Sequence, residues 1–124
     1  MPRINPLDRA RAAARALREA LAPMELACAG TITVRRKMCG NPDCACRRDR
    51  EARHGPYREW TRVRDARLAH TNLTQQQASA LEAAIANYRE IRTKLKRWEL
   101  ATEAAILALD VHTPFPRSRL RRRG

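Results

Sequence analysis

Apolar residues recur at spacings of three and four along the first 25 positions, which is the pattern of a helix with one buried face. Asn5 followed by Pro6 predicts its start, because asparagine caps helices and proline suits the first helical position. Pro23 predicts its end. The apolar positions are Leu7, Ala10, Ala14, Leu17 and Leu21. We therefore expect an alanine-rich amphipathic helix in this segment.

After Gly30 the pattern changes from helical spacing to short runs that favour strands. Residues 31–37 are rich in threonine, isoleucine and valine, which are common in strands. Residues 57–64 alternate apolar and polar positions, a turn is expected near Asp65, and residues 67–70 can return as a third strand. These three runs predict a small antiparallel β-meander.

A second helical pattern begins at Thr74, which forms a capping box with Gln77, three residues later. The next 30 residues contain neither glycine nor proline, and one apolar stripe runs along them. Its members are Leu81, Ile85, Tyr88, Ile91, Leu95, Trp98, Thr102, Ala105, Ile106 and Leu109. Such a helix, roughly 50 Å long at 1.5 Å per residue, is too long for the small sheet to cover. We expect it to pack on the N-terminal helix, on a second copy of itself, or on both.

The expected fold class is α+β, with four segments along the chain. They are an N-terminal helix (1–25), a β-meander with a zinc knuckle (26–72), a long C-terminal amphipathic helix (73–110) and a disordered basic tail (111–124). The tail contains two prolines and five arginines, a composition that does not support a packed core.

Charge and composition narrow the range of partners. The chain has 26 Lys and Arg against 13 Asp and Glu, a net charge of +13, and only 4% aromatic residues. Residues 31–70 carry a net +6 and residues 111–124 a net +5, whereas residues 71–110 are neutral. This excess favours a polyanion, DNA before RNA. No membrane span or secretory leader is recognisable, so we expect a cytoplasmic protein with reduced thiols and no membrane partner.

The chemistry is concentrated in one cluster of cysteine and histidine residues. Cys39, Cys44, Cys46 and His54 lie within 16 positions, separated by four, one and seven residues. Three thiolates and one imidazole form a complete tetrahedral donor set for Zn²⁺. The turn-forming residues between the first two cysteines let the chain double back. We therefore predict a closed, structural zinc site.

Two alternatives remain open at this point. Cys28 could supply a fourth thiolate for an iron–sulfur cluster, although its apolar neighbours favour a buried, unliganded side chain. Cys39 and His54 could form a catalytic thiol–imidazole pair, but the additional cysteines are better explained by a metal. His70 and His112 are isolated, and no phosphate-binding loop or nucleotide fingerprint is present. We expect no enzymatic activity.

Three stretches of the sequence resemble a family of small prokaryotic proteins defined by a domain of unknown function. They are the Cys-Gly-Asn-Pro-Asp-Cys-Ala-Cys run at 39–46, His-Gly-Pro-Tyr at 54–57 and Asn-Tyr-Arg at 87–89. The resemblance extends from Gly30 to about Leu109, with the N-terminal helix and the arginine tail outside it, and Asn41 stands where the family usually has lysine. It implies a zinc knuckle and an association with mobile genetic elements.

The function favoured by these features is a zinc-stabilised, basic nucleic-acid-binding accessory protein. The alternative is a zinc-capped helical module that pairs with a partner protein or with a second copy of the chain. The expected nucleic-acid contacts are Arg35, Arg36, Lys37, Arg47, Arg48, Arg58, Arg62 and Arg64, together with Arg117, Arg119, Arg121, Arg122 and Arg123 of the tail.

Overall fold

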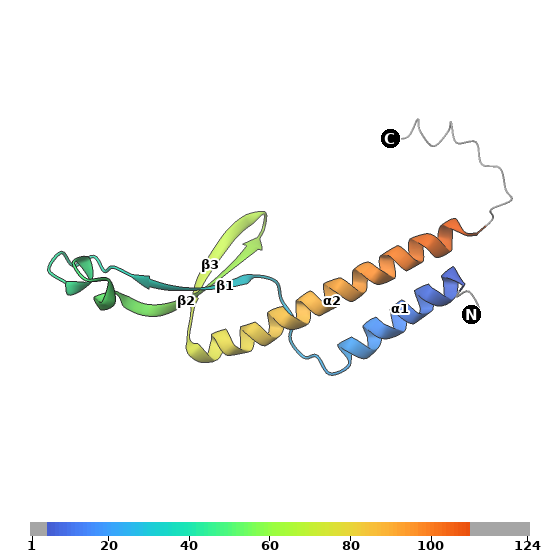
Figure 1. Ribbon diagram of the computed structural model, residues 1–124, viewed down its shortest axis with the longest axis horizontal. Helices are drawn as coiled ribbons and strands as arrows, with labels where there is room; N and C mark the ends of the chain where they lie inside the picture. The colour runs from blue at the N-terminus through green and yellow to red at the C-terminus, as the bar shows by residue number, and fades with distance from the viewer. Residues whose placement is uncertain (1–4, 110–124) are drawn as a thin grey trace, which may run out of the picture. The chain divides into compact units, whose positions relative to one another are not determined.

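The computed structural model describes residues 5–109, which form two helices and a three-stranded antiparallel sheet (Figure 1). This arrangement confirms the expected α+β class. The elements are α1 (Pro6–Leu21), β1 (Thr31–Lys37), the short 3₁₀ helices η1 (Ala45–Arg47) and η2 (Arg50–Ala52), β2 (His54–Arg64), β3 (Arg67–Leu73) and α2 (Gln75–Leu107). The predicted tail, 111–124, lies outside the described residues.

The chain divides into two compact units, and α2 contributes to both of them. The sheet unit comprises residues 24–90, and the helical unit comprises α1 together with the described residues from 91 to 109. The division of the sequence into four segments stays a prediction. No helix among residues 5–109 is long and apolar enough to cross a membrane.

In the helical unit, α1 begins and ends where the sequence predicts. The side-chain Oδ1 of Asn5 accepts a hydrogen bond from the Leu7 N–H at 2.8 Å, and Pro6 occupies the first turn. The helix ends at Leu21, two residues before Pro23. Side chains of α1 and of α2 line a common apolar groove, so the two helices of this unit pack against each other as expected.

The sheet has the strand order β1-β2-β3, with antiparallel pairing throughout. Asp65 and Ala66 form the tight turn between β2 and β3, with φ angles of 52° and 63°. Two consecutive positive φ values match the twist of a two-residue hairpin. Strand β3 extends to Leu73, three residues beyond the predicted 67–70, because Thr71 and Asn72 continue to pair with β2. The sequence did not predict this extension, because the polar residues Thr71 and Asn72 do not continue the apolar pattern of a strand.

Within the sheet unit, the segment before β1 is fixed by Trp60 on β2. The indole N–H of Trp60 donates to the carbonyl oxygen of Ala29 at 3.2 Å. Gly30 has a φ of 138°, and a Cβ at this position would overlap the indole and lie 2.9 Å from the Thr61 carbonyl oxygen. Only glycine satisfies both conditions.

The same segment is hydrogen-bonded to the first half of α2. The backbone N–H of Cys28 donates to the Ala84 carbonyl oxygen at 3.3 Å, and the Asn87 side-chain amide donates to the Leu26 carbonyl oxygen at 3.0 Å. The buried hydrophobic residues of the described chain are few and small, as the alanine-rich composition suggested. They are Ala10, Leu17, Cys46, Ala78, Leu81, Ala84 and Ile85.

The start of α2 carries the capping box that the sequence predicts. The Gln77 N–H donates to the Thr74 Oγ1 at 3.1 Å, and the Thr74 N–H donates to the Gln77 Oε1 at 2.9 Å. The burial of the apolar stripe decreases from the first half of the helix to the second. Leu81 and Ile85 are buried, whereas Leu95 and Trp98 remain exposed by more than a third.

Candidate metal centre

The connection between β1 and β2, residues 39–54, brings four potential metal ligands together, and we refer to it as the Cys/His loop. Cys39 follows β1, Cys44 precedes η1, Cys46 lies within η1 and His54 begins β2. The ligand atoms of these four side chains all lie within 4.8 Å of one another. The structure therefore assembles the group that the sequence proposed as metal ligands.

Local hydrogen bonds explain how the loop doubles back between its first two cysteines. The Asn41 side-chain Oδ1 accepts from the Asp43 N–H at 3.0 Å, and the Asn41 carbonyl oxygen accepts from the Cys44 N–H at 3.3 Å. This asparagine turn reverses the chain within four residues. The 3₁₀ turn that follows then brings Cys46 back toward Cys39.

The spacing of the donor atoms fits a tetrahedral ion. The Sγ atoms of Cys39 and Cys46 are 3.6 Å apart, and the Cys44 Sγ lies 3.4 Å from the His54 Nε2. With Zn–S near 2.3 Å and Zn–N near 2.0–2.1 Å, the edges of a tetrahedron are about 3.8 Å for S–S and about 3.6 Å for S–N. Both measured distances are within a few tenths of an ångström of these edges.

Cys44 and Cys46, on either side of Ala45, occupy different environments. Cys46 is 2% exposed, and its Sγ accepts from the Cys39 N–H at 3.4 Å. That hydrogen bond lowers the pKa of Cys46, but burial and the neighbouring thiols of Cys44 and Cys39 outweigh it, so the pKa is raised. The pKa of Cys44 is lowered, chiefly by hydrogen bonds from the backbone and side chain of Cys46. A cation that binds thiolates would oppose the cost of ionising the buried thiol.

Two of the arginines predicted to bind nucleic acid hold the Cys/His loop in shape. The Arg47 guanidinium donates to the carbonyl oxygens of Cys39 and Asn41, each at 3.3 Å. The Arg36 guanidinium donates to the carbonyl oxygens of Arg53 and Glu51, at 2.9 and 3.3 Å. These side chains also bring positive charge to a donor set that would carry a net charge of −1 around a divalent ion.

Gly55, directly after His54, allows the close approach of β1 and β2 at the ligand end. Its φ is 121°, and a Cβ there would lie 2.9 Å from the Arg35 carbonyl oxygen. The strand register shifts at this point, between Arg35 and Lys37. The glycine of the His-Gly-Pro-Tyr motif thus positions His54 beside the end of β1.

The remaining predicted nucleic-acid contacts are divided between the two faces of the sheet. Arg62 stacks on Trp60, with its guanidinium carbon 3.9 Å from the ring centre, and donates to Thr71 at 2.7 Å. Lys37, on the opposite face, lies 3.9 Å from Glu59. Because side chains alternate along β2, Arg58 and Arg64 share the face of Trp60.

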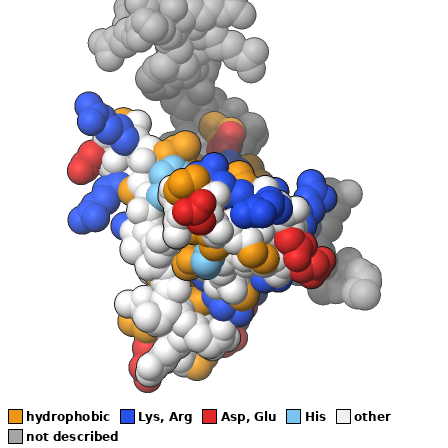
Figure 2. Space-filling model, turned by 90° about the vertical axis from the view of Figure 1, so that its left-hand side faces the viewer, with side chains coloured by type: hydrophobic (Ala, Val, Ile, Leu, Met, Phe, Trp, Pro, Cys, Tyr) orange, Lys and Arg blue, Asp and Glu red, His pale blue; other side chains and the backbone are white. Residues whose placement is uncertain are grey.

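Only part of the predicted basic set is free of intramolecular polar contacts. Within the predicted set, the described side chains of Arg35, Arg48 and Arg64 are exposed and form no hydrogen bond or ion pair within residues 5–109. Figure 2 looks onto the Cys/His-loop end and shows Lys and Arg side chains interspersed with acidic ones. The arginines of the tail, Arg117, Arg119, Arg121, Arg122 and Arg123, lie outside the described residues.

A small cavity of about 170 Å³ adjoins the ligand group and contains a residue that the sequence did not single out. Cys39 and His54 line it together with Tyr57 and Asn72. Asn72 was missed because the third strand was expected to end at His70. Its regular register with Glu59 on β2 brings it to this end of the sheet.

Cys28 and His70 lie apart from the ligand group. Cys28 is half-buried and lines an apolar groove with Trp60 and Leu81. The described residues therefore provide no fourth thiolate beside the other three cysteines, as a cysteine-ligated iron–sulfur cluster would need. His70 lies 3.0 Å from the Thr61 hydroxyl. His112 is outside the described residues.

The chain belongs to the family of the domain of unknown function DUF6788, whose model matches residues 6–71. This match confirms the resemblance based on the Cys/His motifs, but its extent differs from the one expected. It includes α1, which was expected to fall outside, and it stops before the Asn-Tyr-Arg stretch at 87–89. No curated protein and no solved structure matches the chain.

Proposed function

We propose that the Cys/His loop binds one structural zinc ion and that the sheet unit it stabilises contacts nucleic acid. The observation that carries the zinc assignment is the donor set itself. Three thiolates and one imidazole favour Zn²⁺ over the oxygen-preferring cations, and four protein ligands leave no position for water or substrate. We therefore assign the ion a structural role and no catalysis.

The nucleic-acid part of the proposal is supported by charge. The net charge of +13 includes +6 on residues 31–70, which contain β1, the Cys/His loop, β2 and the first half of β3. Since Arg36 and Arg47 are engaged with the loop backbone, Arg35, Arg48 and Arg64 become the members of the predicted set that are best able to contact phosphates. DNA remains favoured over RNA, and the cytoplasmic location and the link to mobile elements stay predictions.

Metal analysis tests the first part of the proposal. Protein purified without chelator should contain about one zinc ion per chain by mass spectrometry of the metal content. Cys44→Ser should lower that content severely, because three ligands hold zinc much more weakly than four. Cys28→Ser is the matched control and should retain the full amount. Wild-type protein without zinc after growth in zinc-supplemented medium would refute the assignment.

A salt-titrated binding assay on duplex and single-stranded probes tests the second part. Replacing Arg35, Arg48 and Arg64 together by alanine should weaken binding and reduce the slope of log affinity against log salt by about 2.7 on duplex DNA, at about 0.9 per phosphate contact. The matched control removes the same charge from the helices, at Arg9, Arg15 and Arg97. Absence of binding to either probe at about 50 mM salt would overturn the proposal.

A further inference from the structure

The helical unit leaves large apolar side chains exposed to solvent near the C-terminal end of α2. Leu100, Ile106, Leu107 and Leu109 are between 54% and 72% exposed. Isolated exposed apolar residues are ordinary on protein surfaces, but a contiguous group of them marks an interaction site. Ile106 and Leu109 line one apolar groove of this unit, and Ile106 and Leu107 line a second one, so these three side chains belong to one grooved apolar surface.

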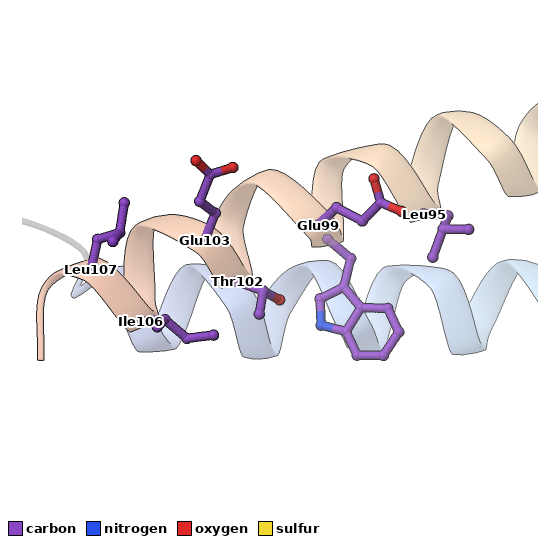
Figure 3. Close-up of a pocket in the computed structure, with 7 residues that line it drawn as sticks. Leu95, Glu99, Thr102, Glu103, Ile106 and Leu107 are labelled. Atoms are coloured by element: carbon purple, nitrogen blue, oxygen red, sulfur yellow. The ribbon is translucent and has the colours of Figure 1, made fainter. Parts of the chain in front are cut away.

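This surface consists of two grooves separated by a ridge. One groove, of about 390 Å³, lies between α1 and α2, and the other, of about 510 Å³, lies on the outer flank of α2. Trp98, Thr102 and Ile106 line both grooves, and we call them the α2 ridge. Figure 3 shows the residues that line the outer groove. Thr102 and Ile106 lie on the side of α2 that faces α1, and Glu103 points away from α1.

The two grooves carry opposite charges at their outer edges. Arg11 of α1 lines the inner groove, whereas Glu99 and Glu103 line the outer one. Arg11 and Glu99 each have an exposed partner, Asp8 at 3.4 Å and Lys96 at 3.8 Å, and such exposed pairs are weak. Glu103 forms no ion pair among the described residues.

We infer that the α2 ridge binds the α2 ridge of a second copy of this chain, with the two copies of α2 parallel. The surface has a basic edge on one side of the apolar ridge and an acidic edge on the other. This arrangement of charge is complementary to itself, which points to a second copy of the chain as the partner. A two-fold axis along the helices exchanges the edges, so each basic edge faces an acidic one. A two-fold axis across the helices would instead place like charges opposite each other, at an electrostatic cost.

In a parallel dimer, residues at the same position along the helix axis lie opposite each other, and this predicts which residues meet across the interface. Arg11 lines the same groove as Thr102 and Ile106, and Glu103 lies between those two residues in sequence. Glu103 of one copy is therefore level with Arg11 of the other. The dimer would convert two helical pairs, each with an exposed apolar face, into a four-helix bundle. This inference is independent of the zinc and nucleic-acid proposals.

Measurement of the molecular mass in solution tests the inference on the full-length protein. Sedimentation equilibrium should give about twice the chain mass of 14.2 kDa. Ile106→Asp should give the monomer mass, because a buried charge replaces an apolar contact at the ridge. Leu68→Asp is the control, since Leu68 is also exposed, at 66%, but lies on the sheet. A monomeric wild type, or a dimer unaffected by Ile106→Asp, would overturn the inference.

Charge reversal tests the parallel arrangement. Arg11→Glu and Glu103→Arg should each raise the dimer dissociation constant by about tenfold or more, and the double variant should recover most of the loss. Arg9→Glu and Glu82→Arg, which make the same charge changes away from the two grooves, should leave it within about threefold. Failure of the double variant to recover affinity would overturn the parallel arrangement.

Discussion

The Cys/His loop and the α2 ridge are both built from residues close in sequence, but they are completed in different ways. The loop closes on itself, because its four donor atoms lie within 4.8 Å and its backbone carbonyls are held by Arg36 and Arg47. The ridge has regular helical geometry, yet Ile106 is still 60% exposed. A local sequence motif can thus bring a complete set of donor atoms together, or it can leave an apolar surface that no other part of the described chain covers.

The difference lies in the kind of interaction that each region uses. Coordination and hydrogen bonds have fixed lengths and directions, so a short segment can satisfy them completely. Burial of apolar surface has no direction and requires a second surface of similar size. The loop should therefore depend on its metal, and the ridge should depend on protein concentration.

The largest expected effect comes from removing the metal. Chelation of the purified protein should abolish protection of the β1–β3 amides from hydrogen exchange, because the core of the sheet unit is too small to replace the metal. The amides of α1 should keep much of their protection. Cys44→Ser should behave like the chelated protein and Cys28→Ser like the wild type. If the amides of both units lost protection equally, the claim that only the sheet unit depends on the metal would be wrong.

Gly30→Ala should cause the next largest effect, within the sheet unit alone. The positive φ and the overlap of the new Cβ with Trp60 should destabilise the protein by about 2–4 kcal/mol in denaturant unfolding. Gly40→Ala is the control, because no atom lies within 4 Å of a Cβ built there. Equal stability of the two variants would show that the contact between Gly30 and Trp60 is not needed.

A smaller effect is expected at the start of α2. Thr74→Ala removes the hydroxyl that caps the Gln77 N–H and should cost about 1 kcal/mol of unfolding free energy. Ser79→Ala, at an exposed position inside the helix, should be neutral or slightly stabilising by the same measurement. A loss at Ser79 as large as the loss at Thr74 would argue against the capping role.

The smallest effect should come from the surface of the helical unit. Lys96→Ala breaks an ion pair with Glu99 whose two side chains are 68% and 59% exposed. Its removal should change the unfolding free energy by less than about 0.5 kcal/mol, and this small change should shrink further as salt is added, because salt screens exposed charges. A larger, salt-dependent loss would show that surface charge contributes to the monomer as well as to the proposed dimer.

Features encoded by neighbouring residues could be predicted from the sequence. The caps at Asn5 and Thr74, the turn at Asp65 and the clustering of the Cys/His donor atoms all depend on residues a few positions apart. The hydrogen bond from Asn87 to Leu26 could not be predicted, since it joins positions 61 residues apart. The distribution of the arginines over the two faces of the sheet could not be predicted either, because the register shift after Arg35 and the hydrogen bonds of the guanidinium groups decide where each side chain points.

The short spacing of the four metal ligands has a consequence for the order of folding. The loops between successive ligands contain four, one and seven residues, and the entropy lost on closing such short loops is small. During synthesis, all four donors are made before α2, the longest helix of the chain. A metal ion bound by this donor set would therefore fix the turn between β1 and β2 while the rest of the chain is still being added, and would act as the nucleus from which the sheet grows.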